Sequence, residues 1–319
     1  MAPILVAHTR ELYLKSPTPQ PPHELTLRVL ATMQSTPEPR LRAIMASLVT
    51  HLHAFVQDVG LTEAEFRSAC AHIARLGQLS NANHNEVVLM AGSLGISSLV
   101  CQINNAGDAQ TDVASTHNLL GPFWRMRSPA TPNGGSIVRS PTPGMPMQVR
   151  AQVLNMQGAP VADALVDVWH CDAQGLYENQ AQARAQGVAD MNLRGQFRTD
   201  AQGRFDFWSI KPLGYPIPTD GVVGQLLQAQ GRHAMRPAHV HALVFKPGYK
   251  TLISQVYAHD DANLGSDVQF GVTPALTGHY VQHSAPPAGR SDVALPWCSL
   301  DFVFRMQAGE AVLPQAPIQ

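Results

Sequence analysis

The chain has 319 residues, of which 45% are hydrophobic and 14% are charged, and its formal net charge at pH 7 is −1. This length accommodates one large domain or two modest ones with a sizeable core, and the composition is that of a globular chain. No basic block is present, so the sequence argues against nucleic acid or an anionic membrane surface as a partner.

The N-terminal stretch carries no recognisable targeting signal. MAPILVAHTRELYLKS has neither a charged region followed by a long apolar region nor a cleavage site. No apolar run reaches the roughly 18 residues that a bilayer span requires. We therefore expect a cytoplasmic protein without a membrane span. Four widely spaced cysteines form no CxxC pair and are expected to be free thiols: Cys70, Cys101, Cys171 and Cys298.

The first hundred residues are patterned as helices. Between residues 41 and 56, apolar side chains recur at the i, i+3, i+4 and i+7 spacing of one helical face. Thr36-Pro37 predicts the start of this helix, with a capping residue and proline in the first turn, and Gly60 predicts its end.

Two further helices are predicted after Gly60. Thr62 and Glu65 have the spacing of a capping box, which predicts a helix that continues to Leu76. The apolar stretch of residues 85–104 predicts a third helix. These elements make residues 1–106 an N-terminal helical segment.

From about residue 106 the pattern changes from helical to strand-like. Residues 127–144 are rich in Pro, Gly, Ser and Thr and are predicted to be loop, and residues 222–231 are predicted to be a short helix. Elsewhere apolar residues alternate with a period of two, as in half-buried strands separated by turns. We predict a mainly β chain: an antiparallel β-sandwich catalytic domain at residues 107–319, preceded by the helical segment.

Two histidines, His239 and His241, lie one residue apart in the apolar run MRPAHVHALVF. Alternate residues of a strand share a face, so both imidazoles would point to the same side of a sheet. Such a pair suits zinc, ferrous iron or no metal at all. A cupin-type site would require a glutamate about four residues after His241, where the sequence has Leu243 to Lys246.

Tyr177 and Tyr215 are the other candidate ligands. Tyr215 lies between Gly214 and Pro216 in IKPLGYPIPTDG, residue types that fix a backbone path and predict a rigid mount. A phenol, with a pKa of about 10, becomes a ligand only when a metal displaces its proton. Hard phenolate oxygens beside two imidazoles favour Fe(III) over soft or divalent ions.

Five segments together resemble the intradiol ring-cleaving dioxygenases, over residues 115–305 and more weakly over the helical part. They are LGPFWR, DVWHCDAQGLY, RTDAQGRFDF, YPIPTDGVVG and GRHAMRPAHVH. The YPIPTDG stretch is most similar to hydroxyquinol 1,2-dioxygenases, followed by chlorocatechol and catechol 1,2-dioxygenases. The resemblance implies O₂-dependent cleavage of the bond between the two hydroxylated carbons of a catechol-type substrate, giving a cis,cis-muconate-type diacid.

The resemblance also implies roles for individual residues. It assigns Tyr177, Tyr215, His239 and His241 as ligands of Fe(III). Arg236 would stabilise negative charge on the substrate ring, Gln255 would lie close to the substrate, and Tyr215 would also act as a base. The helical segment would form a homodimer interface that can hold a phospholipid. The positions implied to line the substrate pocket are Leu89, Gly92, Leu120, Gly121, Pro122, Phe123, Pro216, Ile217 and Pro218.

Two positions depart from the choices usual in the family. Hydroxyquinol members tend to have an aspartate near the position of Gly92, and a glycine there would leave room for a bulkier or differently substituted catechol. Trp124 is a bulky residue near the expected mouth of the pocket, where surface packing is an equally good interpretation.

Two other functions remain open from the residues alone. A metal-dependent hydrolase or cupin-like oxygenase could use His239 and His241 together with a carboxylate. A non-catalytic β-sandwich binding module could share the segment GAPVADALVDVW and the turn TDAQGRFDF for reasons of core packing. The two tyrosines distinguish these functions, because neither alternative requires them.

Overall fold

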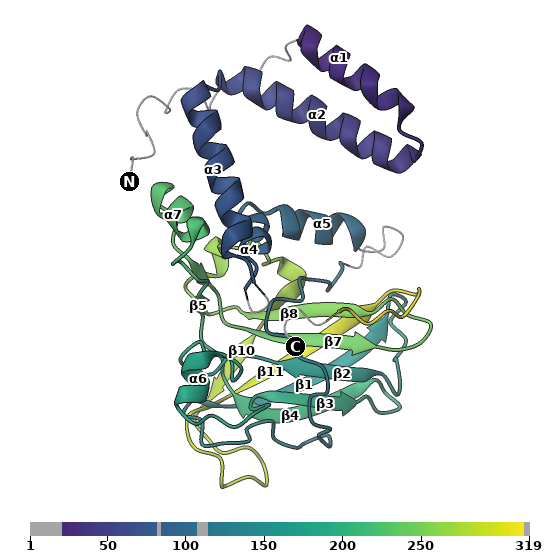
Figure 1. Cartoon of the computed structure of the whole chain (residues 1–319). Helices are drawn as coiled ribbons and strands as arrows, with labels where there is room; N and C mark the ends of the chain where they lie inside the picture. Colours follow the sequence, from purple (N-terminus) through teal and green to yellow (C-terminus); the bar gives the residue numbers. More distant parts are fainter. Residues whose placement is uncertain (1–20, 82–83, 107–113, 316–319) are drawn as a thin grey trace. The chain divides into compact units, whose positions relative to one another are not determined.

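The computed structural model of the chain describes residues 21–81, 84–106 and 114–315 (Figure 1). The chain forms two compact units, Met1–Arg75 and Leu76–Gln319. The first unit is helical. It contains α1 (Glu24–Thr32), the 3-10 helix η2 (Met33–Ser35), α2 (Pro39–Val59) and most of α3 (Glu63–Leu79).

The predicted start of α2 at Thr36-Pro37 is wrong. The helix begins at Pro39, because the carboxylate of Glu38 accepts hydrogen bonds from the first free backbone N–H groups of the helix and thereby caps it. Gly60 ends the helix in the left-handed conformation at φ 57°, as predicted, since a residue without Cβ adopts that conformation at little cost.

The predicted capping box of α3 is confirmed. The N–H of Thr62 donates to Glu65 Oε2 at 2.9 Å, and the N–H of Glu65 donates to Thr62 Oγ1 at 3.3 Å. The helix continues to Leu79, three residues beyond the predicted end at Leu76.

The single helix predicted for residues 85–104 is wrong, because the stretch forms two helices, α4 (Glu86–Ser93) and α5 (Ile96–Asn104). Gly95 separates them at φ 75°, and a Cβ there would lie 3.4 Å from the ring of Phe270. No single helix of the described residues is long and apolar enough to cross a membrane; α4 and α5, bent by 75°, meet those criteria only jointly.

Two larger sheets and one short ribbon contain the strands of the second unit. In the order β10–β11–β1–β4, the first sheet contains Tyr280–His283, Trp297–Met306, Pro146–Asn155 and Arg204–Ile210. In the order β3–β2–β7–β8–β9, the second contains Arg194–Arg198, Leu165–Trp169, His239–Phe245, Leu252–Ala258 and Thr277–Gly278. The ribbon pairs β5 (Tyr215–Pro216) with β6 (Met235–Arg236).

The prediction of purely antiparallel sheets is wrong. β1 pairs with β11 in parallel, and so does β8 with β9, whereas the other paired strands are antiparallel. A parallel pair needs a long connection instead of a hairpin. β1 and β11 can have such a long connection because they lie at opposite ends of the β-rich part of the chain. Local turn signals in the sequence therefore could not show that these two strands run parallel.

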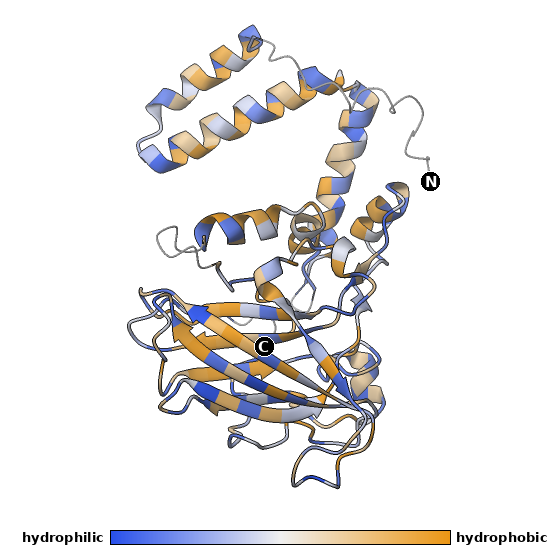
Figure 2. Ribbon diagram, turned by 180° about the vertical axis from the view of Figure 1, so that it is seen from behind, coloured by the Kyte–Doolittle hydropathy of each residue, from blue (hydrophilic) through white to orange (hydrophobic). Residues whose placement is uncertain are grey.

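Side chains from both larger sheets form one hydrophobic cluster. Val149 on β1 and Phe207 on β4 belong to it, together with Val166 on β2 and Val240 on β7. Both larger sheets therefore contribute to one core. Figure 2 shows hydrophilic residues interspersed among hydrophobic ones along the strands of the sheets.

The remaining elements are short. The helix predicted for residues 222–231 is confirmed as α7 (Val222–Ala229), and residues 127–144 contain no helix or extended strand, as predicted. The other short elements are α6 (Ala181–Ala185), η3 (Leu264–Ser266) and η4 (Pro274–Leu276). The side chains that meet at the candidate centre come from β5, from β7 and from the connection between β2 and α6.

Candidate metal centre

The strand β7 places His239 and His241 on one face of the second sheet, and both side chains are buried. In register, His239 lies opposite Tyr257 and His241 lies opposite Gln255 on β8. On the other side of β7, His241 lies opposite Trp169 of β2. β7 pairs with β8 from His239 onward and with β2 from His241 onward, and this pairing fixes the backbone that carries the two imidazoles.

Tyr215 is held at the start of β5, where it pairs with Arg236 of β6. Two glycines allow the close approach of this segment. A Cβ at Gly214 would lie 2.7 Å from the carbonyl oxygen of Arg236, and a Cβ at Gly175 would lie 2.6 Å from the Cβ of Tyr215. The rigid mount predicted for this tyrosine therefore depends on contacts with two distant segments as well as on its flanking prolines.

Tyr177 follows a tight turn after β2. Its backbone N–H donates to Gln180 Oε1 at 2.7 Å, and its ring stacks on Phe123 with centroids 4.3 Å apart. The side chain is only 1% exposed. Contacts on the backbone and on the ring face together fix the direction of the hydroxyl group.

Four donor atoms converge from these three segments. The hydroxyl oxygens of Tyr177 and Tyr215 are 3.3 Å apart, and that of Tyr215 is 3.4 Å from His239 Nε2. His239 Nε2 is 3.2 Å from His241 Nε2, which is 3.1 Å from the Tyr177 hydroxyl. The four atoms thus form a closed ring, from residues that span 64 positions of sequence.

Burial determines the charge state of this set. It raises the pKa of Tyr177 well above its ordinary value, and it raises the pKa of Tyr215 although the charge of Arg236 opposes this. Burial also lowers the pKa of His239 to about 3 and that of His241 well below its usual range. The metal-free set is therefore two neutral phenols and two neutral imidazoles, and the imidazoles are in the form that binds metals.

The surroundings of the two histidines orient their rings. His239 Nδ1 donates to the carbonyl oxygen of Pro237 at 2.7 Å, which leaves the lone pair of Nε2 directed into the ring of donor atoms. His241 stacks on Trp169, with centroids 4.7 Å apart and an interplanar angle of 8°. His241 Nδ1 is buried and has no hydrogen-bond partner among the described residues.

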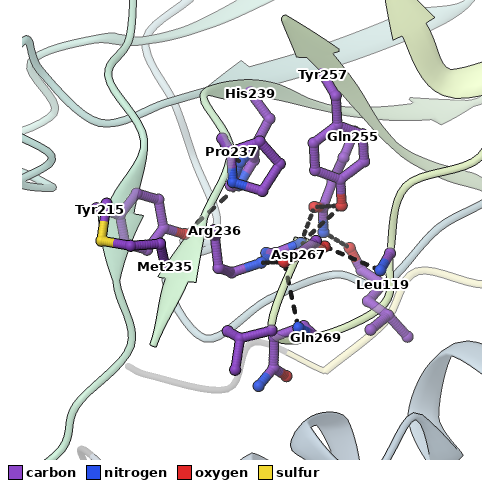
Figure 3. A network of polar contacts seen from close by, with 12 residues as sticks. Leu119, Tyr215, Met235, Arg236, Pro237, His239, Gln255, Tyr257, Asp267 and Gln269 are labelled. Carbon is purple, nitrogen blue, oxygen red and sulfur yellow. Dashed lines mark hydrogen bonds and ion pairs between the residues drawn. The ribbon is translucent and has the colours of Figure 1, made fainter. Parts of the chain in front are cut away.

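Arg236 lies beside this centre in a buried polar network (Figure 3). Its Nε donates to Asp267 Oδ1 at 3.1 Å and its Nη2 to Asp267 Oδ2 at 3.2 Å. Nη2 also contacts the Tyr257 hydroxyl at 2.6 Å and Gln255 Oε1 at 3.0 Å. Burial opposes the charge, but Tyr257 and Asp267 raise the pKa of Arg236 well above its usual value, so the guanidinium stays protonated.

Asp267→Asn should lower the free energy of unfolding at pH 7 by about 3 kcal/mol, because it removes the charge that compensates a buried guanidinium. Burial raises the pKa of Asp267, but Arg236 outweighs it and the net shift is downward. The ionised carboxylate thus stabilises the fold above its unfolded pKa of about 4, and this stability is lost as pH falls through the lower folded value.

Urea denaturation at pH 7 and at pH 3 measures both parts of this prediction. The acid-induced loss of stability should be smaller in Asp267→Asn than in the wild type. Asp301→Asn is the control, since its pair with Arg150 is exposed and should contribute less than about 1 kcal/mol. If Asp267→Asn and Asp301→Asn lowered the free energy of unfolding at pH 7 equally, the role of Asp267 would be contradicted.

Of the nine residues predicted to line a pocket, five lie in two groups, three are exposed prolines and the ninth is Gly92. Leu120 and Phe123 pack with Tyr177 and Tyr215, and a Cβ at Gly121 would lie 3.1 Å from His241 Cε1. A second group packs away from the tyrosines and contains Leu89 and Ile217. The three predicted prolines are exposed: Pro122, Pro216 and Pro218.

Two expectations about this region are wrong. Trp124 lies neither on the surface nor at an open mouth: it is 3% exposed, and its Nε1 donates to Asp167 Oδ2 at 3.1 Å. Gly92 does not leave room, because a Cβ there would lie 1.8 Å from Gln269 Oε1. The side chain of Gln269 occupies the space that the sequence alone left open.

Sequence reasoning missed Tyr257, Asp267 and Trp169. Tyr257 could have been found, because it is two residues after Gln255 and must share its face of β8. Trp169 and Asp267 carried no comparable signal. Their contacts with His241 and Arg236 depend on sheet pairing and on a loop that returns from a distant part of the chain.

Comparisons with known proteins identify the family of the chain. A family model described as "Dioxygenase" matches residues 120–304, and one described as "Catechol dioxygenase N terminus" matches residues 38–112. The chain is 37% identical to 6-chlorohydroxyquinol 1,2-dioxygenase of Cupriavidus pinatubonensis, over 82% of this chain and 92% of that protein. It is 39% identical to hydroxyquinol 1,2-dioxygenase of a Rhizobium species, over 79% of this chain and 83% of that one.

Solved structures give the same result. Hydroxyquinol 1,2-dioxygenase from Pseudomonas putida is similar with a TM-score of 0.79 and 35% identity, covering 89% of this chain and 98% of that one. Catechol 1,2-dioxygenase from Pseudomonas arvilla is similar with a TM-score of 0.72 and 29% identity, covering 92% and 93%. The similarity thus includes the N-terminal helices as well as the sheets.

Proposed function

The chain belongs to the intradiol ring-cleavage dioxygenases, which cleave catechol-type substrates with O₂, and we propose that it holds their non-haem iron as Fe(III) at the centre described above. The observation that carries the proposal is the closed ring of four donor atoms. In this proposal the ligands are Tyr177, Tyr215, His239 and His241.

The chemistry of the donor set fits a ferric ion. Two phenolates are hard anionic ligands, and two neutral imidazoles complete a set that leaves one net positive charge on Fe(III). The phenols must lose their protons to bind, and a strongly Lewis-acidic ion makes this favourable despite their raised pKa values. When bound, such an ion supplies a Lewis acid and a template for the two oxygens of a catecholate.

The protein groups around the centre have separate tasks in this proposal. The Tyr215 oxygen accepts a proton from the substrate diol. Arg236 lowers the pKa of both phenols, and for Tyr215 it opposes burial both through its charge and through a hydrogen bond. Arg236 presents a fixed positive charge where negative charge develops on the ring. Gln255 positions that charge: its Oε1 accepts from Arg236, while its Nε2 donates to the carbonyl oxygen of Leu119 at 2.6 Å.

Apolar and aromatic side chains keep bulk water from this site. Trp169 is fully buried against the ring of His241, and Phe123 covers the ring of Tyr177. Electrostatic interactions are stronger in such a low-dielectric environment than in water. The arrangement therefore favours the charge-stabilising role assigned to Arg236.

Iron loading followed by oxygen uptake tests the proposal. The ferric protein should show a broad visible absorption from phenolate-to-iron charge transfer, and it should consume O₂ and a catechol in equal amounts. Mass spectrometry should find both oxygen atoms of ¹⁸O₂ in a ring-opened diacid. A colourless protein that stays inactive after iron loading would overturn the proposal; zinc-loaded protein is the control.

The competing functions have less support. A hydrolase or cupin-like oxygenase built on His239 and His241 needs a carboxylate ligand, and no group of three or more His, Cys, Asp or Glu within residues 21–81, 84–106 and 114–315 is placed to hold a metal. A binding module would account for the shared core but has no use for the convergence of Tyr177 and Tyr215.

We further propose that residues 1–106 form a homodimer interface that can bind a phospholipid. The supporting observation is an exposed apolar row on α2: Leu41, Ile44, Leu48, Leu52, Phe55, Val56 and Val59. Exposed apolar surfaces of this extent commonly mark interaction sites. Sedimentation equilibrium should give twice the chain mass of 34.5 kDa, and a monomer at micromolar concentration would contradict the proposal.

A further inference from the structure

We propose that Tyr257 is a positioning residue, whose hydroxyl group holds the guanidinium of Arg236 in the place where it acts on the substrate ring. This inference rests on the proposed function, because it gives Tyr257 a part in the task assigned above to Arg236. Tyr257 is fully buried, and its ring lies beside that of His239, with centroids 5.2 Å apart. Its ring thus packs next to the centre, and its hydroxyl group makes the contacts that support the proposal.

The first support is a closed triangle of three polar atoms (Figure 3). The Tyr257 hydroxyl oxygen is 2.6 Å from Arg236 Nη2 and 2.6 Å from Gln255 Oε1, and these two atoms are 3.0 Å apart. Because Gln255 Nε2 donates to the carbonyl oxygen of Leu119, Oε1 faces the triangle and can only accept. The Tyr257 hydroxyl therefore donates its one hydrogen to Gln255 and accepts from Arg236.

The second support is that Tyr257 adds a constraint to the ion pair of Arg236. The bonds from the guanidinium to Asp267 are 3.1 and 3.2 Å long, whereas the bond to the Tyr257 hydroxyl, at 2.6 Å, is its shortest among the described residues. The carboxylate supplies the compensating charge. The hydroxyl group fixes Nη2 relative to β8, where Tyr257 lies directly opposite His239 of β7. Without the hydroxyl group the charge should remain at the centre, but its position should be looser.

The third support is Asn118, which connects the same hydroxyl group to a loop that lies against His241. Asn118 is buried, and its Nδ2 donates to the Tyr257 hydroxyl oxygen at 3.2 Å. Three residues later, a Cβ at Gly121 would lie 3.1 Å from His241 Cε1. The Tyr257 oxygen thus accepts from two sides, and it joins Arg236 to a loop that adjoins a proposed ligand.

The fourth support is Gly271, which allows the close packing of this network. A Cβ at Gly271 would overlap the Tyr257 hydroxyl oxygen and would lie 3.1 Å from Arg236 Nη2. Its backbone N–H donates to Asp267 Oδ2 at 2.9 Å, and its carbonyl oxygen accepts from Asn118 Nδ2 at 2.9 Å. Because two hydrogen bonds hold position 271, a larger side chain there would press on the hydroxyl group without removing any polar atom.

Tyr257→Phe tests the inference by separating kcat from KM in the iron-loaded protein. The kcat for catechol should fall roughly ten-fold, the typical effect of losing one hydrogen bond to a charged group. The KM should change by less than about two-fold, because the charge of Arg236 is retained. Tyr280→Phe is the matched control: its hydroxyl group is also buried, it donates to the carbonyl oxygen of Val256, and its loss should leave both constants unchanged. A kcat of Tyr257→Phe within roughly two-fold of the wild type would overturn the inference.

The Arg236→Met background distinguishes a positioning role from an independent effect. If Tyr257 acts through Arg236, adding Tyr257→Phe to Arg236→Met should lower kcat further by less than about two-fold. A second fall of roughly ten-fold would show that Tyr257 acts by itself, and it would overturn the inference. If the iron-loaded wild type cleaves no catechol at all, the proposed function fails. If it cleaves catechol and Tyr257→Phe keeps the wild-type kcat, only the role of Tyr257 fails.

Gly271→Ala disturbs the same hydroxyl group while every polar atom stays in place. It should lower kcat roughly five-fold in the wild type, but by less than about two-fold once Tyr257→Phe is present, because the oxygen that it presses on is then absent. Gly265→Ala is the matched control, since a Cβ there would meet no other segment of the described chain within 4 Å. Equal effects of Gly271→Ala in the two backgrounds would overturn the inference.

Thermal unfolding of the metal-free protein gives a readout that is independent of activity. Tyr257→Phe should lower the Tm by roughly 3–6 °C, because a buried bond to a charged group is lost. In the Arg236→Met background the same change should lower the Tm by less than half as much, because the effects of residues in contact are not additive. Tyr280→Phe should lower the Tm equally in both backgrounds. Equal Tm shifts for Tyr257→Phe in the two backgrounds would show that its hydroxyl group does not hold Arg236.

Discussion

Tyr215→Phe should weaken and shift the visible absorption of the iron-loaded protein, because only the Tyr177 phenolate remains as a charge-transfer ligand, and it should lower turnover of catechol on the order of 10³-fold. The substitution removes one oxygen and leaves the ring in place, so its packing beside Tyr177 is retained. The substitution therefore removes a proposed ligand and the proposed base together.

Tyr177→Phe should reduce iron affinity and shift the absorption, because it removes a ligand that has no assigned role in proton transfer.

Tyr280→Phe is the matched control for these variants. Tyr280 is also buried, and its hydroxyl donates to the carbonyl oxygen of Val256 at 3.2 Å, outside the ring of donor atoms. It should retain the colour and the activity. If Tyr177→Phe and Tyr215→Phe kept wild-type iron affinity and turnover, a site built only on His239 and His241 would replace the one proposed here.

Arg236→Met should lower turnover by roughly 10²–10³-fold, the cost of losing one preorganised group that stabilises developing charge. Methionine approximates the length of the arginine stem but carries no charge. The loss should appear mainly in kcat, because the proposed interaction is stronger in the transition state than in the bound substrate. Steady-state oxygen uptake over a range of catechol concentrations separates kcat from KM.

A second variant is needed because Arg236→Met also leaves Asp267 buried without its partner. This should lower the free energy of unfolding by about 3–5 kcal/mol. Adding Asp267→Asn removes the unpaired charge, so the double variant should regain much of the stability but none of the turnover. Recovery of turnover in the double variant would show that Arg236 acts on stability alone.

Much of the local structure follows from the sequence. The capping box at Thr62 and the end of a helix at Gly60 were predicted because each depends on residues within one or two turns. The prediction failed where a glycine inside an apolar run breaks a helix. Residues 85–104 have the pattern of one helix, but they break at Gly95, which adopts the left-handed conformation at φ 75°.

The sequence by itself determined which residues can form the centre. Two histidines with strand spacing must share a face, and a tyrosine between glycine and proline must be rigidly mounted. Resemblance to a known family then supplied roles for these residues. None of this required knowledge of where the segments lie in space.

Only the tertiary structure decided which distant segments meet at the site. The ring of donor atoms joins Tyr177 to His241 across 64 residues, and parallel pairing of β1 with β11 joins strands from opposite ends of the β-rich unit. The same is true of Gln269, which fills the space beside Gly92 from a position 177 residues later in the chain (269 − 92 = 177). Local periodicity encodes the face on which a side chain lies, but steric exclusion between distant segments decides what stands opposite it.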